Sequence, residues 1–330
     1  MKIGYIIDQT CCVSGPSNGV RMQAIIWAEA LVAKGHHVEY IQAWGSYDWK
    51  SFDVIHLFGF GESVDFVDNL YQRGCKLVIS PIIDTVQNPK LYKLSTLWGC
   101  KRLRLTSPTF RLRQVKDKIS LFFARSVYEA NYIKVAYGLS DDKVKIVPLS
   151  YRSDSKEIAY SIKENFCFHC SSITQVRKNV MRLIQAAIKY KFNLVLAGST
   201  NPPEAFKPFK KLIDANDNIQ CLGFVSDEQL EDLYVRAKVF ALPSLNEGVG
   251  LVALEAAMHG CDIVITNVGG PKEYYAEYAY FVNPLSVDEI GQAVVSAMSS
   301  SKQPELKHYI EHNYNLDKCV TDIVTLYSEL

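Results

Sequence analysis

The stretch that decides the fold is residues 239–260, Val-Phe-Ala-Leu-Pro-Ser-Leu-Asn-Glu-Gly-Val-Gly-Leu-Val-Ala-Leu-Glu-Ala-Ala-Met-His-Gly. Its first part, the apolar run at 239–244, is typical of a buried parallel strand. From Gly250 onward the apolar residues recur at helical spacing, and Gly260 stands where a helix C-cap is expected. The stretch therefore predicts a strand that leads through a glycine-bearing turn into a helix.

This turn predicts an anion site. The N–H groups of Gly250, Leu251 and Val252 fall at the start of the predicted helix, where they lack intrahelical acceptors and the macrodipole is positive. Two carboxylates bracket the site, Glu247 in the turn and Glu255 in the helix. A carboxylate does not favour a phosphate, so we expect these two side chains to bind hydroxyl groups.

The segment from Glu247 to Glu255 resembles the E-x7-E signature of glycosyltransferase family 4, and the similarity continues through the strand and Gly-Gly turn at 262–273. The resemblance covers essentially the whole chain. It implies an α/β architecture of the GT-B type, with two Rossmann-like doubly wound parallel-sheet domains facing across a cleft. It also implies a retaining enzyme that takes a nucleotide-diphosphate sugar as its donor.

The resemblance also implies roles for individual residues. Glu255 is expected to bind the nucleotide ribose, and Glu247 is expected to face the donor sugar. The other residues expected at the donor are Gly248, Gly250, Leu251 and Val252.

Length and composition set the class of protein. A chain of 330 residues suits two domains, and 48% hydrophobic with 22% charged residues is typical of a soluble globular protein. The net charge of +1 gives no global attraction to nucleic acid or membrane. We find no signal peptide and no apolar run of the ~18 residues that a membrane span needs. We expect a cytoplasmic protein, with the inner face of the membrane as an alternative location, whose nine cysteines are reduced thiols.

Strands alternate with helices in both halves, which predicts parallel sheets. We expect an acceptor-side domain at 1–150 and a donor-binding domain at 151–315, joined by a polar linker at 150–165. By the resemblance, the last helix, 316–330, packs back on the first domain. Residues 84–119 show no regular element. The expected strands are 2–8, 37–43, 53–59, 76–83, 120–126 and 144–149, then 166–173, 193–198, 219–224, 239–244, 262–267 and 279–283.

The first turn carries Gly15 and Gly19 but no G-x-G-x-x-G, which disfavours a nicotinamide dehydrogenase. The turn resembles the glycine-rich loop that lies against the donor phosphates in the family. The alternative is that both glycines serve only the turn.

A basic pair, Arg177-Lys178, precedes Asn179 at the start of a helix predicted from about 178 to 190. Negative charge grows on the leaving diphosphate during glycosyl transfer, so an enzyme needs fixed positive charge there. The pair resembles the family's diphosphate-binding residues, although Ser172 and Ile173 stand where many members have an additional arginine. The alternative is a solvated pair in the first helical turn, where cations oppose the dipole.

Neither a metal nor a cofactor is expected. No D-x-D motif stands at a strand end, and Asp141-Asp142 is typical of a turn. A glycosidase is disfavoured because its two carboxyl groups must face one scissile bond, whereas Glu247 and Glu255 flank an anion site.

The acceptor side is less well defined. His56 resembles a histidine often found at the third strand of the family, with a structural histidine as the alternative. The family's histidine after the fourth strand is missing, and Asp84 stands near its place. The sequence leaves acceptor activation open.

Residues 101–118 hold seven basic residues against one acid, with leucines interleaved. Such stretches dock on anionic membranes, which would suit a lipid-linked acceptor. The alternative is a solvated basic face. Nucleic acid is not expected, because no recognition fold accompanies the charge. The basic residues are Lys101, Arg102, Arg104, Arg111, Arg113, Lys116 and Lys118.

The sequence therefore predicts a metal-independent, retaining glycosyltransferase that moves a hexose-type sugar from a nucleotide-diphosphate donor to a glycan or lipid-linked acceptor in surface-polysaccharide or glycolipid synthesis. A nucleotide-sugar epimerase and a catalytically silent nucleotide-sugar binder are the alternatives.

Overall fold

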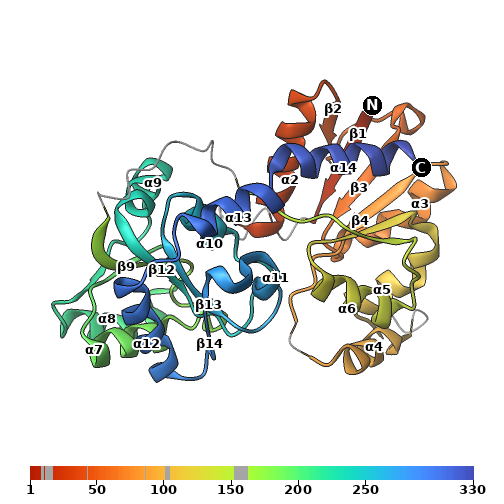
Figure 1. Cartoon of the computed structure of the whole chain (residues 1–330). Helices are drawn as coiled ribbons and strands as arrows, with labels where there is room; N and C mark the ends of the chain where they lie inside the picture. Colours follow the sequence, from red (N-terminus) through yellow and green to blue (C-terminus); the bar gives the residue numbers. More distant parts are fainter. Residues whose placement is uncertain (9–10, 12–17, 43, 86, 101–104, 152–162) are drawn as a thin grey trace. The chain divides into compact units, whose positions relative to one another are not determined.

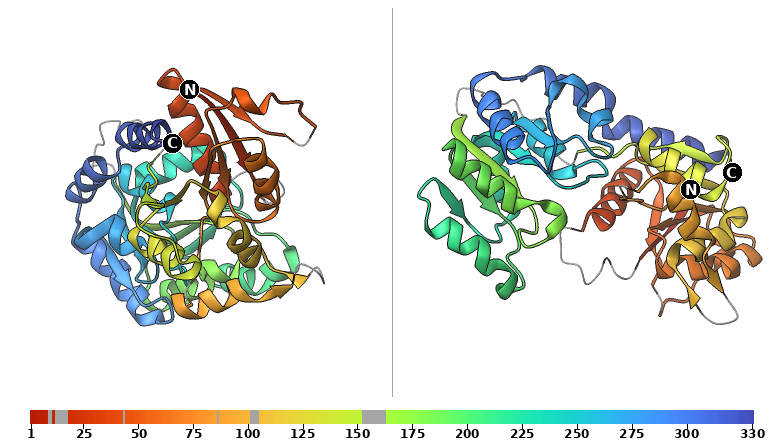
Figure 2. Two further views of the ribbon diagram at one scale, coloured as in Figure 1. Left: turned by 90° about the vertical axis from the view of Figure 1, so that its right-hand side faces the viewer. Right: turned by 90° about the horizontal axis from the view of Figure 1, so that it is seen from below.

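The computed structural model describes residues 1–8, 11, 18–42, 44–85, 87–100, 105–151 and 163–330. The chain divides into two compact units, which we call unit 1 (Met1–Leu149 with Leu316–Leu330) and unit 2 (Ser150–Asn315). Each unit is built on a six-stranded parallel sheet with helices on both faces (Figures 1 and 2). The predicted α/β class, with two doubly wound parallel sheets, is confirmed.

Unit 1 has the strand order β2-β1-β3-β4-β7-β8, with every neighbouring pair parallel. The central strands are buried along their length, which explains their nearly continuous apolar sequences. Helix α14 contacts α2 within this unit. The elements are β1 Lys2–Ile7, α2 Gly19–Ala33, β2 His37–Tyr40, β3 Val54–Phe58, α3 Val67–Gln72, β4 Leu77–Ser80, α4 Pro89–Leu97, α5 Pro108–Val115, β7 Leu121–Ala124, α6 Val127–Tyr137, β8 Val144–Ile146 and α14 Leu316–Ser328.

The sequence interpretation missed the regular structure in 84–119. This region contains α4, α5 and a short antiparallel hairpin of β5 (Gly99–Cys100) and β6 (Leu105–Thr106). Both helices have proline at their start, after the N-caps Asn88 and Ser107, whose side chains accept N–H groups of the first turn. These are standard start signals. They were overlooked because basic and apolar residues are mixed on both helices.

Unit 2 has the strand order β11-β10-β9-β12-β13-β14, which is the Rossmann order. The first three strands are added toward one edge of the sheet and the last three toward the other, so the order of addition reverses at a switch point between β9 and β12. The elements are β9 Glu164–Cys170, α7 Val180–Tyr190, β10 Leu194–Ala197, α8 Pro203–Asp214, β11 Ile219–Cys221, α9 Asp227–Arg236, β12 Ala237–Leu242, α10 Leu251–Met258, β13 Asp262–Thr266, α11 Pro271–Tyr275, β14 Tyr280–Val282, α12 Val287–Ser299 and α13 Glu305–Asn313.

Several local predictions for unit 2 are confirmed. Ser226 and Gln229 form the expected capping box of α9, and Ser286 caps α12. The Cys167–Cys170 run lies in β9, where His169 Nδ1 donates to Ala241 O and Nε2 accepts from Ser171 Oγ. Burial lowers the pKa of His169 to about 4, so this histidine is a neutral core residue. Across the described ranges, no helix combines the length and apolar character needed to cross a bilayer.

Candidate functional site

The predicted anion site has the expected backbone. Gly250 adopts a left-handed conformation (φ +82°), and α10 begins at the next residue. The N-cap residue Gly250 has no side chain to cap this helix, and within the described residues the N–H groups of Leu251 and Val252 are left for a ligand or solvent. A Cβ at Gly250 would lie 3.1 Å from Leu242 Cδ2 and 3.2 Å from Ile265 Cδ1, so both the backbone conformation and the tight packing favour glycine here.

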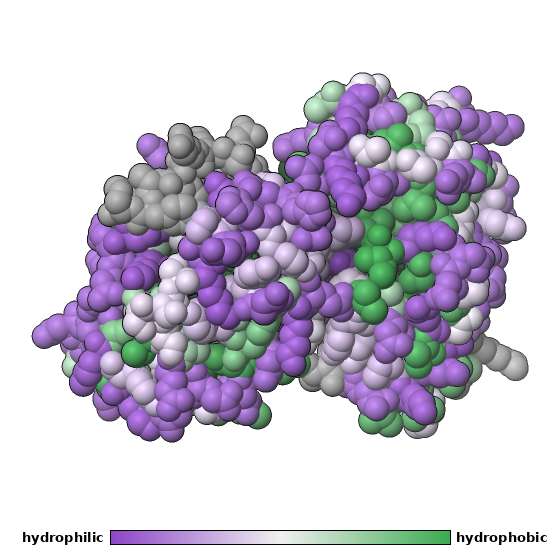
Figure 3. Space-filling view, in the orientation of Figure 1, coloured by the Kyte–Doolittle hydropathy of each residue, from purple (hydrophilic) through white to green (hydrophobic). Residues whose placement is uncertain are grey.

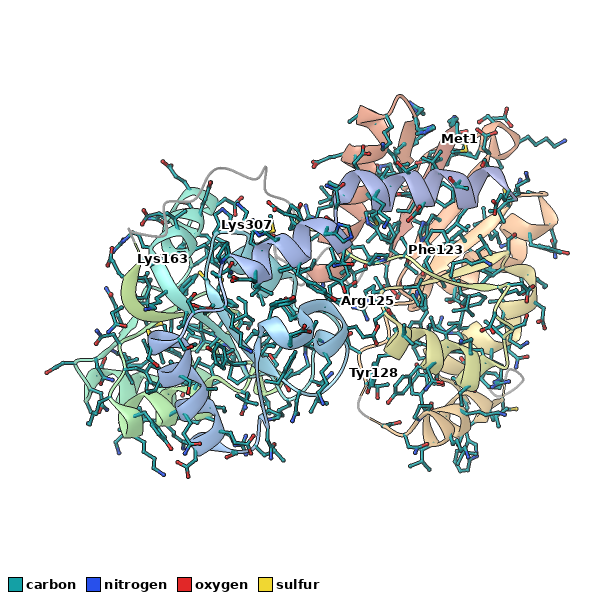
Figure 4. The ribbon with its side chains drawn as sticks, viewed as in Figure 1. Met1, Phe123, Arg125, Tyr128, Lys163 and Lys307 are labelled. Atoms are coloured by element: carbon teal, nitrogen blue, oxygen red, sulfur yellow. The ribbon has the colours of Figure 1, made fainter. Side chains whose placement is uncertain are left out.

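Both ends of the turn and helix are fixed by distant residues. Tyr275 Oη donates to Gly250 O at 3.0 Å and holds the left-handed residue in place. At the other end, the partly buried Lys163 donates to the carbonyls of Tyr234 and His259, the C-cap of α10 (Figure 4). A cation there complements the negative end of the helix dipole. The negative end of the α10 dipole is therefore compensated by a cation, whereas the N-cap residue at the positive end provides no side chain.

Glu247 is held by the turn after β13. Its N–H donates to Val268 O, its carbonyl accepts from Gly270 N–H at 3.2 Å, and the pair Glu247–Gly269 forms a parallel β-bridge. Gly269 has φ +104°, and a Cβ on it would lie 1.9 Å from Glu247 O. The Gly-Gly turn found in the sequence is therefore the support on which Glu247 rests.

The basic pair contacts Glu247 directly. Lys178 Nζ lies 2.7 Å from Glu247 Oε1, and Arg177 Nη1 lies 3.4 Å from Oε2. Ser244 Oγ donates to Oε1 at 2.7 Å. Only 6% of the Glu247 side chain and 16% of the Lys178 side chain is exposed, whereas 32% of the Arg177 side chain is, so Lys178 at least is not a solvated cation.

The basic pair also differs from its predicted setting. Arg177 and Lys178 lie in a 3-10 turn (Val176–Lys178), and α7 starts only at Val180. The predicted helix start at about 178 is wrong because Asn179 takes a left-handed conformation (φ +59°) that separates turn from helix. The two cations therefore precede α7 and do not lie in its first turn.

Asn179 is a site residue that the sequence interpretation did not single out. Its Nδ2 donates to Pro243 O at 2.8 Å and to Pro284 O at 2.7 Å, and its Oδ1 accepts from Arg182. The side chain thereby joins the loops that follow β9, β12 and β14. This clamp, together with Leu245 N–H donating to Arg177 O, brings the basic pair to Glu247. An Asn directly after a basic pair was the available signal, since Asn tolerates the left-handed region.

Glu255 lies on the inner side of α10. It is 8% exposed, which excludes the alternative of a solvent-exposed helical glutamate. Burial raises the pKa of Cys170 to about 12, and the nearby Glu255 carboxylate contributes to this shift. Burial also raises the pKa of Tyr275 well above its ordinary value, with Glu247 and Glu255 adding to the effect. Both carboxylates therefore influence the Tyr275 hydroxyl, which donates to Gly250 O.

These groups meet at one edge of the sheet. Arg177 and Lys178 follow β9, Glu247 and Gly250 follow β12, and the Gly-Gly turn follows β13. The carboxyl edge at the switch point between β9 and β12 is where ligands bind in open α/β sheets. The arrangement offers two cations and a helix N-terminus to an anion, with carboxylates beside them for hydroxyl groups.

The glycine turn of unit 1 is only partly described. Gly15 lies outside the described residues. Gly19 is the first residue of α2, and the preceding Asn18 accepts the N–H groups of Val20 and Arg21 through Oδ1. The first turn of α2 is thus capped by its own chain, and a role of Gly19 toward donor phosphates stays a prediction.

His56 is not an acceptor-side residue. It lies within β3 with no exposed surface, and its ring nitrogens are hydrogen-bonded to Tyr327 Oη and Ser80 Oγ. Burial lowers the pKa of His56 to about 3, so the ring is neutral. The prediction that it faces the acceptor is wrong, because a core residue that joins β3, β4 and α14 cannot reach a substrate.

Asp84 belongs to a charged cluster that the sequence interpretation missed. Its Oδ1 accepts from Arg125 Nη2 at 2.8 Å, and Arg125 Nε donates to Glu129 Oε2 at 2.8 Å (Figure 4). The two carboxylates raise the pKa of Arg125 although burial alone would lower it. Of these three charged residues, Asp84 is the exposed one, and it follows the carboxyl end of β4. An acceptor-side role for Asp84 stays a prediction. Ser126-x-x-Glu129, a helix-start pattern, was the available signal.

The described part of the basic stretch 101–118 is not a fully solvated basic face. Lys101, Arg102 and Arg104 lie outside the described residues. Arg111 pairs with Asp65, Lys116 with Asp117, and Lys118 with Asp68, while Arg113 donates to Thr96 Oγ1 and Ala136 O. Carboxylates thus pair with three of these four cations, and Arg113 is held by neutral acceptors.

No group of three or more His, Cys, Asp or Glu side chains with metal-binding geometry occurs in the described parts of the chain. Whether catalysis needs a metal stays a prediction.

Comparisons with known proteins bear on the family of unit 2 and on the fold. Residues 153–315 match the model of the family "Glycosyl transferases group 1", a range that holds every site residue of unit 2 named above. A protein named as an uncharacterized glycosyltransferase of Methanocaldococcus jannaschii is 26% identical over 218 residues, covering 58% of this chain and 55% of that protein. The O-antigen chain mannosyltransferase B of Escherichia coli is 26% identical over 167 residues, covering 47% of this chain and 43% of that protein. The chain thus spans about half the length of these curated relatives.

The fold extends over the whole chain. The Anabaena protein HepE, solved in complex with UDP-glucose, superposes with a TM-score of 0.75 at 16% identity, covering 100% of both chains. This likeness establishes the GT-B fold.

The close approach of Gly269 to Glu247 gives a testable prediction. Gly269→Ala should destabilise the protein by more than the ~1–2 kcal/mol expected for a left-handed non-glycine residue, because its Cβ collides with Glu247 O. Gly35→Ala is the matched control, since Gly35 has φ +83° and its Cβ would meet nothing within 4 Å. Denaturant unfolding of both variants measures the difference. Equal losses in the two would contradict the described support of Glu247.

Proposed function

We propose that the chain is a glycosyltransferase of the family 4 type, which transfers a hexose-type sugar from a nucleotide-diphosphate donor with retention of configuration and without a metal ion. The acceptor is a glycan or a lipid-linked sugar. The synthesis of a surface polysaccharide or glycolipid is the proposed setting.

One observation carries the proposal. Two cations, the uncapped N-terminus of α10 and two buried carboxylates converge at the switch point of unit 2, within the range that matches the group 1 family. A nucleotide-diphosphate sugar has the complementary chemistry, because it joins a diphosphate to two sugars rich in hydroxyls. The named relatives add support, since several are called mannosyltransferases. Mannose is accordingly the first donor sugar to test.

The positive groups would stabilise the leaving diphosphate. As the bond between the anomeric carbon and the phosphate oxygen breaks, negative charge accumulates on that oxygen. Arg177, Lys178 and the N–H groups of Leu251 and Val252 are preorganised donors for this charge. Glu247 holds the Lys178 ammonium in position, so this cation need not be ordered during the reaction.

The carboxylates would bind sugars. In this proposal Glu255, on the inner side of α10, accepts hydrogen bonds from the ribose. Glu247, between the basic pair and the Gly-Gly turn, faces the donor sugar. In this proposal Glu247 has two tasks, which are to orient Lys178 and to bind a hydroxyl of the sugar that moves.

The alternatives gain no support. The names of the relatives describe transfer and not epimerisation. A silent binder would have no need of two cations held at a leaving-group position by a buried acid.

Substitution of Glu255 and of Glu247 should affect nucleotide affinity and turnover differently. Glu255→Ala should weaken the affinity for the preferred nucleoside diphosphate about tenfold or more, since a hydrogen bond to a charged group contributes ~1.5–3 kcal/mol. Glu247→Gln should change that affinity little and lower turnover by ~10²-fold or more. Glu228→Ala, an exposed glutamate on α9, is the control and should leave both quantities unchanged. Equal losses of affinity and turnover in Glu247→Gln would contradict its placement at the donor sugar.

Metal independence is tested with the wild-type protein. Transfer should continue in excess EDTA, because the basic pair and the α10 N-terminus take the place of a divalent cation. The measurement is the initial rate of nucleoside diphosphate release with and without EDTA. Loss of activity that Mg²⁺ or Mn²⁺ restores would show that the metal-free proposal is wrong.

A further inference from the structure

Helix α4 of unit 1 presents a row of large apolar side chains to the outside. Leu91 is 61% exposed, Leu94 57%, Leu97 49%, and Trp98, directly after the helix, 85%. In Figure 3 the lower part of unit 1, where Figure 1 places α4, carries apolar surface. Single exposed apolar residues are ordinary, but a contiguous group of this size on one helix is not.

The row is one face of the helix. At 100° per residue, the three leucines span about 120° of the helix circumference. The opposite side carries Tyr92 and Thr96, which are buried where α4 packs on α5 and α6. The helix is therefore anchored by one face, and its second apolar face has no partner within the described residues. Leu105 in the adjoining hairpin, 66% exposed, extends this surface.

Positive charge accompanies the apolar row. Lys90 and Lys93 are exposed on the same side of α4, and within the described part of the chain neither forms an ion pair. Residues 88–116 contain eight lysines and arginines and no acidic residue. By contrast, Arg111, Lys116 and Lys118 form ion pairs with Asp65, Asp117 and Asp68. We call Lys90, Leu91, Lys93, Leu94, Leu97 and Trp98 the α4 face.

We propose that the α4 face docks on the surface of an anionic lipid bilayer. Leucines would enter the boundary between headgroups and acyl chains, and the lysines would extend their ammonium groups to lipid phosphates. Tryptophan favours this same depth, because its ring is apolar and its N–H finds polar partners. Apolar residues, lysines and tryptophan on one exposed face, in a segment (88–116) without acidic residues, match this occupant.

Charge argues against the two other occupants. A second copy of the chain would bring two positively charged faces together without any acidic residue to pair with them. A nucleic acid would match the lysines but would leave the leucines and Trp98 in water. The bilayer satisfies both parts of the surface.

The proposal places the protein where a lipid-linked acceptor is found, and it relocates the predicted membrane contact from 101–118 to α4. It is independent of sugar transfer, because binding to vesicles is measured without donor or acceptor. Failure of one proposal therefore leaves the other intact.

Vesicle cosedimentation of the full chain tests the proposal. Wild-type protein should bind vesicles of equimolar phosphatidylcholine and phosphatidylglycerol, and should bind vesicles of phosphatidylcholine alone far more weakly. Leu94→Ser combined with Trp98→Ser should lower the partition coefficient at least about tenfold. Lys90→Gln combined with Lys93→Gln should lower it about fivefold for each lysine. All four residues are exposed, so the melting temperatures of both variants should equal that of the wild type.

The matched control is Trp44→Ser, because Trp44 is also 85% exposed in unit 1 but lies outside α4. This variant should bind vesicles like the wild type. The proposal is overturned if wild-type protein does not bind the anionic vesicles, or if Trp44→Ser loses as much binding as the Leu94/Trp98 variant. It is also overturned if sedimentation shows a wild-type dimer that only the Leu94/Trp98 variant dissociates, since the face would then be a contact between copies.

Discussion

The candidate site depends on one nearly buried ion pair, between Lys178 and Glu247. Two charges held away from water are costly, and such a pair is often less stabilising than apolar residues of the same volume. The surrounding structure offsets this cost with further polar contacts, from Ser244 Oγ and from Arg177. The proposed function gives a reason for keeping the pair, because it holds a cation ready at the position where charge develops.

Other residues of unit 2 hold in position the backbone segments that carry this pair. Gly269 allows the turn after β13 to approach Glu247, and Asn179 ties the turn after β9 to the loop after β12. Tyr275 fixes Gly250, and Lys163 fixes the other end of α10. Each of these contacts joins segments distant in sequence, so the site is assembled by the sheet order and not by one motif. A parallel sheet with its switch point between β9 and β12 brings all of these turns to one edge.

The sequence predicted those parts of the site that depend on local chemistry. The turn at Gly250, the start of α10 and the caps of α9 and α12 follow from residue type and spacing, and the structure has them where expected. The contacts that Asn179, Tyr275 and Arg125 make do not follow from local sequence, because each of these side chains forms hydrogen bonds to residues 25 or more positions away. His56 shows the same limit, since its partner Tyr327 lies 271 positions away. Spacing alone could not tell a core histidine from a catalytic one.

The central claim is that the switch point of unit 2 is a nucleoside diphosphate site that depends on its basic pair. Calorimetric titration of the wild type and of Lys178→Met with UDP, GDP and ADP, and with the matching nucleosides, tests it most directly. The account predicts that one diphosphate binds the wild type, that its nucleoside binds at least about 100-fold more weakly, and that Lys178→Met loses at least about tenfold in diphosphate affinity. Equal affinity for nucleoside and diphosphate, or no binding of any diphosphate by the folded protein, would contradict it.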